Sequence, residues 1–282
     1  MIVGIAQIAP HLGDVQKNLE SHLELIEEGR KSKADLLIFP ELSLTGYTLQ
    51  DMVEEVAISP EKSSVMRELQ EISREISLAV GFVEEKEKGL YYNSSAFLSQ
   101  DKITHIHRKV FLPTYGIFEE AKFYAQGKNF HTFPTPYGHT GMLICYDFLH
   151  YGASYLLYAG GAEIILVLSS APGRGVSGEN GFESCQWFEL MGAAISRFST
   201  AFVVYCNRVG QEDGKIFPGG SFIYAPSGEL LVKAPYFEKG LILQDINIDD
   251  IRISRKKRLY KRDDKPEIIL HALERIVRKY ED

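Results

Sequence analysis

Cys145 is the residue whose type and position point most directly to chemistry. It ends the apolar segment GMLIC, which is typical of a buried strand, and a turn follows it. In an α/β sheet the carboxyl end of a strand opens into a crevice, where backbone N–H groups can hold an oxyanion. The position suits a nucleophilic thiol, and it equally suits a buried structural cysteine. We interpret Cys185 and Cys206 as structural.

No histidine is well placed to activate that thiol. His150 follows Cys145 closely, but no papain-like run surrounds the cysteine. His105 and His107 alternate onto one face of a predicted strand without a third ligand, so we predict no metal site. The sequence contains no HExxH, Walker-type or GxGxxG motif, and we expect no cofactor.

Two other charged residues follow apolar segments in the same way. Glu41, in FPELSLTGY, comes just after the segment DLLIF. It is either a solvated edge residue or a half-buried carboxylate with a raised pKa, suited to acid–base catalysis. Lys109, in HRKVFLPTYG, is either a surface charge or a fixed cation that stabilises an oxyanion.

The elements that must position these residues alternate along the chain. Apolar segments predict strands at residues 1–8, 35–39, 77–84, 91–100, 102–108, 141–145, 163–170 and 201–207, with a hairpin around residues 227–228. Helical spacing of apolar residues predicts helices through Val15-Leu19-Leu23-Ile26 and Met66-Leu69-Ile72-Ile76, and at residues 153–162 and 183–198. This order predicts a two-sheet core with helices on both outer faces.

The chain has no linker-like segment, so we predict one domain over residues 1–282. The tail from about residue 249 carries a basic run and then a predicted helix over residues 266–280. A basic run is usually a solvated face, and we assign it no chemistry. We expect the tail to pack on the domain or on a subunit partner.

The composition excludes several classes of protein. The 282 residues are 45% hydrophobic and 24% charged, as in ordinary globular proteins. The net charge of -7 argues against a general nucleic-acid-binding protein. No apolar run approaches the ~20 residues that span a bilayer, and no leader is visible. With three widely spaced cysteines, we expect a cytoplasmic protein with reduced thiols and no membrane or nucleic-acid partner.

Taken together, the segments FPELSLTGY, RKVFLPTYG and ICYD resemble the three catalytic motifs of the nitrilase superfamily of carbon–nitrogen hydrolases, in order and at the usual spacing. Further similarity lies in GIAQ, YYNSSAF, the segment from Glu120 to Gly127, LVLSSAP, NRVG and FPGGSFIYAPSGELL. The resemblance implies a four-layer α-β-β-α sandwich. It also implies a homodimer or higher homo-oligomer.

The resemblance also implies roles for single residues. Glu41 would be the general base and then the general acid. Lys109 and the backbone N–H of Tyr146 would bind the oxyanion, while Cys145 attacks the carbonyl carbon and forms a thioester. The second glutamate of the family falls on Glu120 rather than Glu119. An activated Cys145 should have a depressed pKa, which would distinguish the enzyme from a non-catalytic scaffold of the same fold.

The substrate is less well determined by sequence. The ICYD form resembles stand-alone amidases and carbamoyl hydrolases, so we predict hydrolysis of a small linear amide or N-carbamoyl compound. Other motifs resemble the glutaminase domain of NAD synthetase, and a free-standing glutaminase subunit is the alternative. Tyr146 and Ala171 depart from that domain, which usually has an acidic residue and a serine there. A nitrile hydrolase is a further alternative.

Four residues are candidates for the substrate pocket. For Tyr47, Tyr115 and Tyr146 the alternative is simple packing. Arg174, in PGRGVSG, would pair with a substrate carboxylate or point into water.

Overall fold

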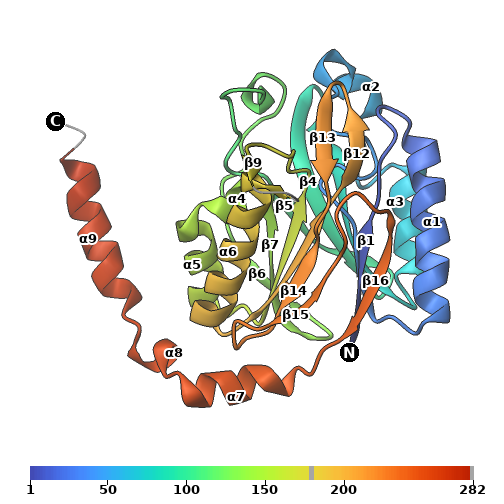
Figure 1. Cartoon of the computed structure of the whole chain (residues 1–282). Helices are drawn as coiled ribbons and strands as arrows, with labels where there is room; N and C mark the ends of the chain where they lie inside the picture. Colours follow the sequence, from blue (N-terminus) through green and yellow to red (C-terminus); the bar gives the residue numbers. More distant parts are fainter. Residues whose placement is uncertain (178–180, 280–282) are drawn as a thin grey trace.

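The computed structural model describes residues 1–177 and 181–279, and Figure 1 shows two β-sheets packed between layers of helices. Two predicted segments end outside the described residues. These are the loop PGRGVSG, at Gly178, and the last predicted helix, at Tyr280.

The first sheet has the strand order β16-β1-β2-β3-β4-β5. Its strands are β1 (Ile2–Gln7), β2 (Leu36–Ile38), β3 (Ser77–Glu87), β4 (Leu90–Ser99), β5 (Lys102–Arg108) and β16 (Gly240–Asp245). β1, β2 and β3 are parallel, so their carboxyl ends meet at one edge of the sheet. The sequence pattern did not predict β16, which pairs antiparallel with β1.

The second sheet has the strand order β15-β14-β11-β8-β7-β6. Its strands are β6 (Thr132–Thr135), β7 (Gly138–Ile144), β8 (Ile164–Ser169), β11 (Phe202–Asn207), β14 (Phe222–Tyr224) and β15 (Leu230–Lys233). β7, β8 and β11 are parallel, and the hairpin β14–β15 turns where it was predicted.

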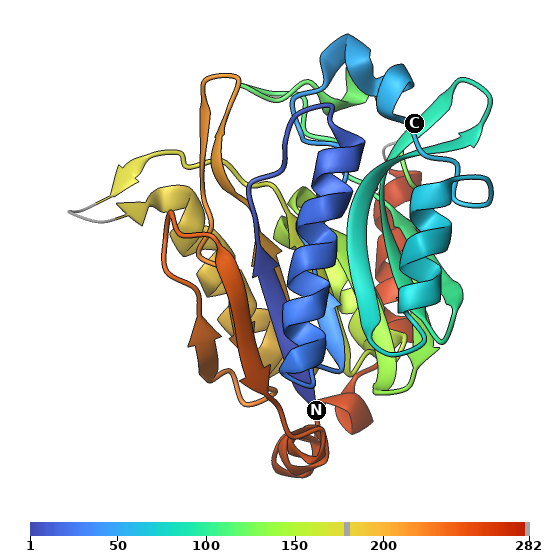
Figure 2. The same cartoon turned by 90° about the vertical axis from the view of Figure 1, so that its right-hand side faces the viewer.

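Helices cover the outer face of each sheet. Figure 2 shows α1 (Val15–Lys31) and α3 (Ser64–Ile72) over the first sheet, and α5 (Tyr151–Ala159) and α6 (Glu183–Ser199) lie over the second in Figure 1. Apolar side chains of both sheets, such as Val3, Ile5, Leu166 and Val204, are buried in one cluster between them. The predicted four-layer α-β-β-α sandwich is confirmed.

One predicted helix is shorter than its apolar pattern. The spacing extended it to Ile76, but α3 ends at Ile72. Ser73 follows as its cap, and its hydroxyl donates to the carbonyl of Gln70 at 2.7 Å. Ile76 is buried just before β3 instead. A buried residue at helical spacing therefore does not by itself extend a helix.

The remaining elements are short or lie in the tail. They are η1 (Gln50–Met52), α2 (Val53–Val56), η2 (Glu120–Lys122), α4 (Tyr146–Leu149), β9 (Val176–Ser177), β10 (Gly181–Phe182), β12 (Val209–Glu212), β13 (Lys215–Pro218), α7 (Asp249–Lys257), α8 (Tyr260–Asp263) and α9 (Pro266–Arg278).

The tail helices differ in how they meet the body. Ile251 and Ser254 of α7 are buried, whereas no residue of α9 is buried. Figure 1 shows α9 standing beside the body on the side of α5 and α6. Within residues 1–177 and 181–279, no helix has the length and apolar character required to cross a membrane.

Candidate active site

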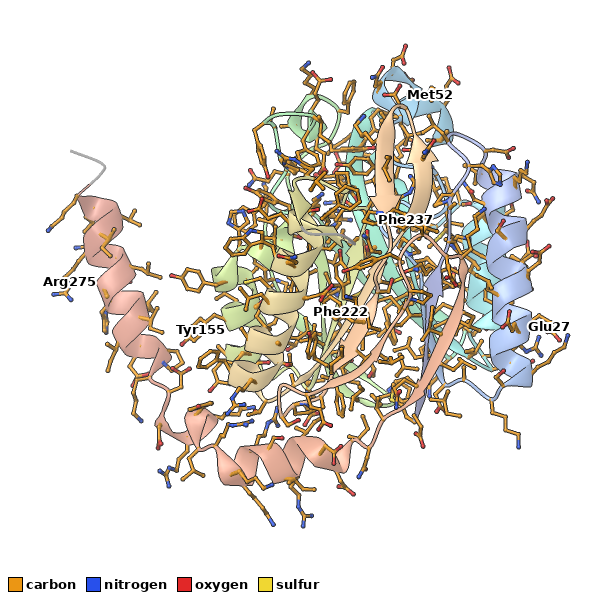
Figure 3. All side chains as sticks on the ribbon, in the orientation of Figure 1. Glu27, Met52, Tyr155, Phe222, Phe237 and Arg275 are labelled. Atoms are coloured by element: carbon orange, nitrogen blue, oxygen red, sulfur yellow. The ribbon has the colours of Figure 1, made fainter. Side chains whose placement is uncertain are left out.

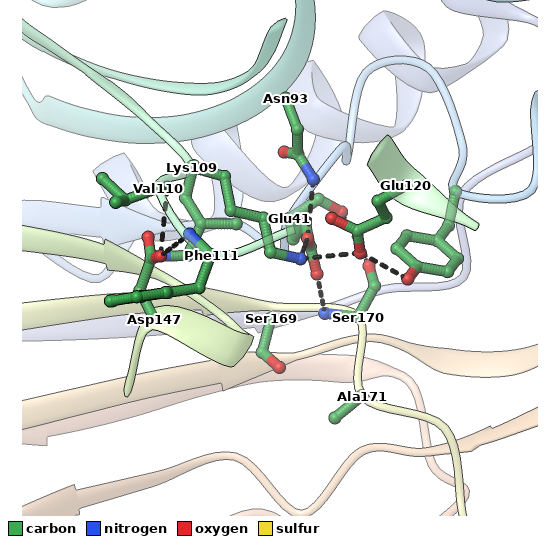
Figure 4. A network of polar contacts seen from close by, with 12 residues as sticks. Glu41, Asn93, Lys109, Val110, Phe111, Glu120, Asp147, Ser169, Ser170 and Ala171 are labelled. Atoms are coloured by element: carbon green, nitrogen blue, oxygen red, sulfur yellow. Dashed lines mark hydrogen bonds and ion pairs between the residues drawn. The ribbon is translucent and has the colours of Figure 1, made fainter. Parts of the chain in front are cut away.

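Three site residues follow the carboxyl ends of strands. Lys109 and Cys145 come directly after their strands, and Glu41 lies in the short segment after its strand. The strands are β2 and β5 of the first sheet and β7 of the second. Packing of the two sheets brings these residues within electrostatic reach of one another. Figure 4 shows the side chains of Glu41 and Lys109 turned toward each other in a polar network.

Lys109 lies between two carboxylates. Its Nζ donates to Glu41 Oε1 and to Glu120 Oε1, both at 2.7 Å. The Lys109 side chain is 0% exposed. Burial alone would lower the pKa of Lys109, but Glu120 and Glu41 outweigh it and raise this pKa well above its ordinary value. The lysine is therefore a fixed cation, and two of its three N–H donors are used by the carboxylates.

Glu41 is held from three sides. Its Oε1 accepts from Asn93 Nδ2 as well as from Lys109, and its Oε2 accepts from the backbone N–H of Ser170, each at 2.7 Å. The Ser170 hydroxyl donates to the backbone carbonyl of Glu41 at 2.8 Å. These contacts join β4 and the segment after β8 to Glu41 and fix its orientation.

Glu120, not Glu119, belongs to this network. Glu120 Oε1 also accepts from the hydroxyl of Tyr47 at 2.6 Å. Burial and the Glu41 carboxylate raise the pKa of Glu120 to about 7, against the opposing effect of Lys109. Glu119 points outward, is 49% exposed and pairs with Lys122.

Cys145 occupies a strained turn between β7 and α4. Its φ of 44° and ψ of -98° are unusual for a residue with a side chain. Burial, followed by the Glu41 carboxylate, raises the pKa of the Cys145 thiol, although Lys109 opposes this. The expectation of a depressed pKa was therefore wrong, because the thiol is buried beside a carboxylate as well as a cation. A raised pKa keeps the Cys145 thiol protonated at rest.

Asp147 joins the lysine segment to the cysteine turn. Its Oδ1 accepts from the backbone N–H of Val110 at 3.1 Å and of Phe111 at 2.9 Å. Its Oδ2 accepts from the backbone N–H of Ile144 at 3.2 Å and contacts His107 Nε2 at 2.9 Å. Asp147 is fully buried, so one carboxylate fixes the residues next to Lys109 relative to those next to Cys145.

Two glycines allow the backbones of this site to approach closely. A Cβ on Gly81 would come within 2.5 Å of the Pro40 carbonyl oxygen, next to Glu41. A Cβ on Gly127 would lie 2.1 Å from the Arg108 carbonyl oxygen and 3.0 Å from that of Lys109. A larger residue at either position would displace a backbone that carries a site residue.

The other candidate pocket residues divide into two groups. Tyr47 belongs to the polar network through Glu120. Tyr115, Tyr146 and Arg174 form a separate aromatic cluster, in which the tyrosine rings are 5.8 Å apart and the guanidinium lies 5.5 Å from the centre of the Tyr115 ring. Tyr115 is 46% exposed and Arg174 is exposed, so this cluster faces solvent.

Sequence reasoning missed several supporting residues. Glu212 is one of them: its Oε1 accepts from the backbone N–H groups of Tyr47 and Thr48, and its Oε2 from buried Arg208 at 2.6 Å. Asn93, Asp147 and Ser170 are others. Asn93, Asp147 and Ser170 lie in motifs quoted above, whereas Glu212 lies outside them, and the roles of all four depend on partners far away in the chain. For the first three the signal available in sequence was only their position within those motifs, and for Glu212 there was none.

His105 and His107 do not form a ligand cluster. His107 contacts Asp147, while the ring of His105 stacks on Phe133 at 4.3 Å. Across residues 1–177 and 181–279, no group of three or more histidine, cysteine or acidic side chains is arranged to hold a metal ion.

Comparison with known proteins identifies relatives of this chain. The carbon-nitrogen hydrolase family model matches residues 2–256, which is most of the chain. The chain belongs to the carbon-nitrogen hydrolase family. Members of this family are enzymes, and residues 41, 109 and 145 of this chain carry the charged and thiol groups described above.

Individual relatives of this carbon-nitrogen hydrolase are of two kinds. The glutamine-dependent NAD(+) synthetase of Acinetobacter baylyi is 29% identical over 253 residues, covering 90% of this chain and 45% of that protein. The chain thus spans about half the length of such relatives. Among solved structures, a carbon-nitrogen hydrolase from Helicobacter pylori G27 has a TM-score of 0.87 at 23% identity, covering 97% of this chain and 98% of that one. An amidase from Nesterenkonia sp. AN1 has a TM-score of 0.78 at 23% identity, covering 96% and 99%.

Proposed function

We propose that this carbon-nitrogen hydrolase cleaves a small linear amide or N-carbamoyl compound through a thioester on Cys145. The observation that carries the proposal is the buried Lys109 cation, held by Glu41 and Glu120 within electrostatic reach of a neutral thiol. A thiol, a carboxylate base and a fixed cation are the groups that a two-step acyl transfer needs.

In the first step Glu41 takes the thiol proton as the sulfur of Cys145 bonds to the carbonyl carbon. The third N–H of Lys109 and the backbone N–H of Tyr146 bind the oxyanion. The tetrahedral intermediate then collapses: the C–N bond breaks, and protonated Glu41 gives its proton to the leaving nitrogen. Ammonia or an amine departs, and the acyl group stays on sulfur as a thioester.

In the second step Glu41 removes a proton from water, which attacks the thioester carbon. The same donors bind the second oxyanion. The C–S bond breaks, the acid leaves, and the proton returns from Glu41 to the sulfur. Atoms and charge balance, because one water is consumed for each C–N bond broken.

Two buried acceptors favour an amide over a nitrile as substrate. Glu120 Oε2 and Asn93 Oδ1 are buried and have no hydrogen-bond partner among the described residues. An amide or carbamoyl nitrogen carries N–H donors that match such acceptors, whereas a nitrile nitrogen carries none. Leaving buried acceptors unpaired costs about 1–3 kcal/mol each, which penalises a substrate without donors.

The decisive experiment is ammonia release from a panel of aliphatic amides, N-carbamoyl compounds, glutamine and nitriles. We expect release from amides or carbamoyl compounds, abolished in Cys145→Ala and retained in the matched Cys185→Ala variant. No release from any class, or release that survives Cys145→Ala, would overturn the proposed function.

The second candidate is a glutaminase that supplies ammonia to a separate NAD synthetase. The similarity to the glutamine-dependent NAD(+) synthetase of Acinetobacter baylyi favours it. Tyr146 and Ala171 count against it, because neither supplies the acidic or hydroxyl group expected for glutamine recognition. Glutamine turnover that appears only when an ammonia-dependent NAD synthetase is added would favour this candidate over the first.

A further inference from the structure

A polar pocket lies at the edge of the first sheet, where the hairpin β3–β4, the end of β5 and the segment before β6 meet. It has a volume of about 260 Å³, and we call it the basic pocket. Among the described residues, no aspartate or glutamate lines it. In a chain with a net charge of -7, such a lining is typical of a site for an anion. Its cationic and imidazole side chains are those of Lys86, His105, His107, Arg108, Lys128 and His131.

The positive charge of the basic pocket is not neutralised from within. Lys86 and Lys128 are exposed, and neither forms an ion pair with another residue of 1–177 or 181–279. Burial, followed by His107 and other nearby bases, lowers the pKa of His105 to about 4. The bases of the pocket therefore disfavour one another's charge, and an anion among them would offset this repulsion.

Two donors of the basic pocket are already fixed in place. The Arg108 guanidinium donates to both carboxylate oxygens of Glu84 and lies 5.1 Å from the centre of the Tyr92 ring. These two bonds leave its other N–H groups without a partner among the described residues. Buried His107 hydrogen-bonds through Nε2 to Asp147 at 2.9 Å. Side chains that are held before binding lose less entropy when a ligand arrives.

We propose that the basic pocket binds a phosphate dianion, either free phosphate or the phosphate group of a small monoester. A phosphate group carries a charge of about -1.5 to -2 at neutral pH and presents strong acceptor oxygens, which suits a lining rich in donors. A carboxylate carries less charge, and chloride has no directional acceptors. The pocket is larger than phosphate itself, and Tyr92 supplies an aromatic face for an organic substituent. This site is independent of the substrate proposed above.

The basic pocket is distinct from the active site but adjoins its supports. Glu41 and Cys145 do not line it. Arg108 directly precedes Lys109 in the chain, and the backbone N–H of Gly127 donates to the Lys109 carbonyl at 2.8 Å. A bound dianion therefore contacts segments that hold Lys109, yet its binding is measured without any amide substrate.

The test is isothermal titration calorimetry of the full chain with inorganic phosphate, at a constant ionic strength near the physiological value. We expect saturable binding with a Kd of about 1 mM or below. Lys128→Glu should raise this Kd at least about 10-fold, because it replaces a cation at the pocket with an anion. Lys128 is exposed, so the variant should fold normally, which circular dichroism verifies.

Lys239→Glu is the matched control, since it makes the same change of charge at the opposite edge of the first sheet. Exposed Lys239 directly precedes β16, the first strand in the order that ends with β5. Figure 3 shows the nearby Phe237 beside the hairpin of β12 and β13, where its N–H donates to the carbonyl of Pro218. The Debye length is about 8 Å at physiological salt, so the Kd should change by less than about 2-fold.

A second readout locates the anion within the protein. A bound dianion should raise the pKa of His105 from about 4, because negative charge nearby favours the imidazolium form. Histidine NMR titrations with and without phosphate measure this change. His271 on α9 lies outside the pocket and is the internal control.

Phenyl phosphate distinguishes the two sources of the phosphate group. Binding at least about 10-fold tighter than that of inorganic phosphate would identify a monoester as the ligand, whereas equal or weaker binding would identify free phosphate. Three results would overturn the proposed site. These are the absence of saturable binding of either compound, a Kd that Lys128→Glu leaves unchanged, and a pKa of His105 that does not move when phosphate binds.

Discussion

The buried charge network of Glu41, Lys109 and Glu120 differs from the aromatic cluster of Tyr115, Tyr146 and Arg174 in its burial and in the contacts that hold it. Glu41, Lys109 and Glu120 are inaccessible or nearly so, and short hydrogen bonds fix each of them. Tyr115 and Arg174 lie at the surface and interact through ring contacts at more than 5 Å. The network holds its charges in one geometry, whereas the aromatic cluster faces solvent. We therefore expect the two regions to differ in their tolerance to substitution.

Lys109→Met is the strongest test of that difference. It leaves two buried carboxylates without their cation, so we expect the free energy of unfolding to fall by about 3–5 kcal/mol. The rate constant kcat should fall at least about 10³-fold, because the oxyanion loses its donor. Urea unfolding and ammonia release measure the two effects. The control Lys122→Met removes an exposed ion pair and should change stability by less than about 1 kcal/mol. Equal losses of stability and kcat in Lys109→Met and Lys122→Met would show that the buried network is no more sensitive to substitution than the surface.

Asp147→Ala extends the comparison to the support of the network. Three backbone N–H groups would lose their buried acceptor, at about 1–3 kcal/mol each. We expect a loss of stability of at least about 3 kcal/mol and a fall in kcat of about 100-fold, because Lys109 and Cys145 lose their fixed separation. Asp147→Asn keeps one side-chain oxygen, so its stability and its kcat should lie between those of the wild type and those of Asp147→Ala. A variant that unfolds more easily but retains the wild-type kcat would make Asp147 purely structural.

Glu120→Gln probes the charge of the network through pH. Because the pKa of Glu120 is raised from 4.5 to about 7, the native state binds more protons than the unfolded state between these values. The contribution of Glu120 to stability is thus fully present below pH 4.5 and is lost as the pH rises to 7. Glu120→Gln should lack this pH-dependent loss of stability. Its kcat should fall about 10- to 100-fold. Unfolding curves that depend on pH identically in both proteins would contradict the assigned pKa.

Arg174→Ala should have the smallest effect. Arg174 is exposed, so stability should change by no more than about 0.5 kcal/mol. For substrates that carry a carboxylate, kcat/KM should fall up to about 10-fold through KM, whereas neutral amides should be unaffected. A large change in kcat for neutral amides would mean that Arg174 acts together with the buried network rather than with the aromatic cluster.

Local sequence pattern predicted most of the strands and helices that carry the site. Apolar runs located the strands before Glu41, Lys109 and Cys145, because alternation and burial are properties of neighbouring residues. β16 and the hairpin β12–β13 were missed, since β16 is a mixed-polarity edge strand and β12–β13 is short. The contacts that fix Glu41 reach Asn93 and Ser170, which lie 52 and 129 residues away. No local pattern encodes such partners.

The sequence by itself determined the residue types of the site, the strands that present them and the family to which the chain belongs. Only the tertiary structure decided that burial raises the pKa of the Cys145 thiol and of the Glu120 carboxyl. It also decided that the apolar residues of α9 are left exposed, whereas Leu19 and Ile26 of α1 are buried. The physical reason is the same in each case. Desolvation and burial depend on what packs around a group, and the packing partners come from distant parts of the chain.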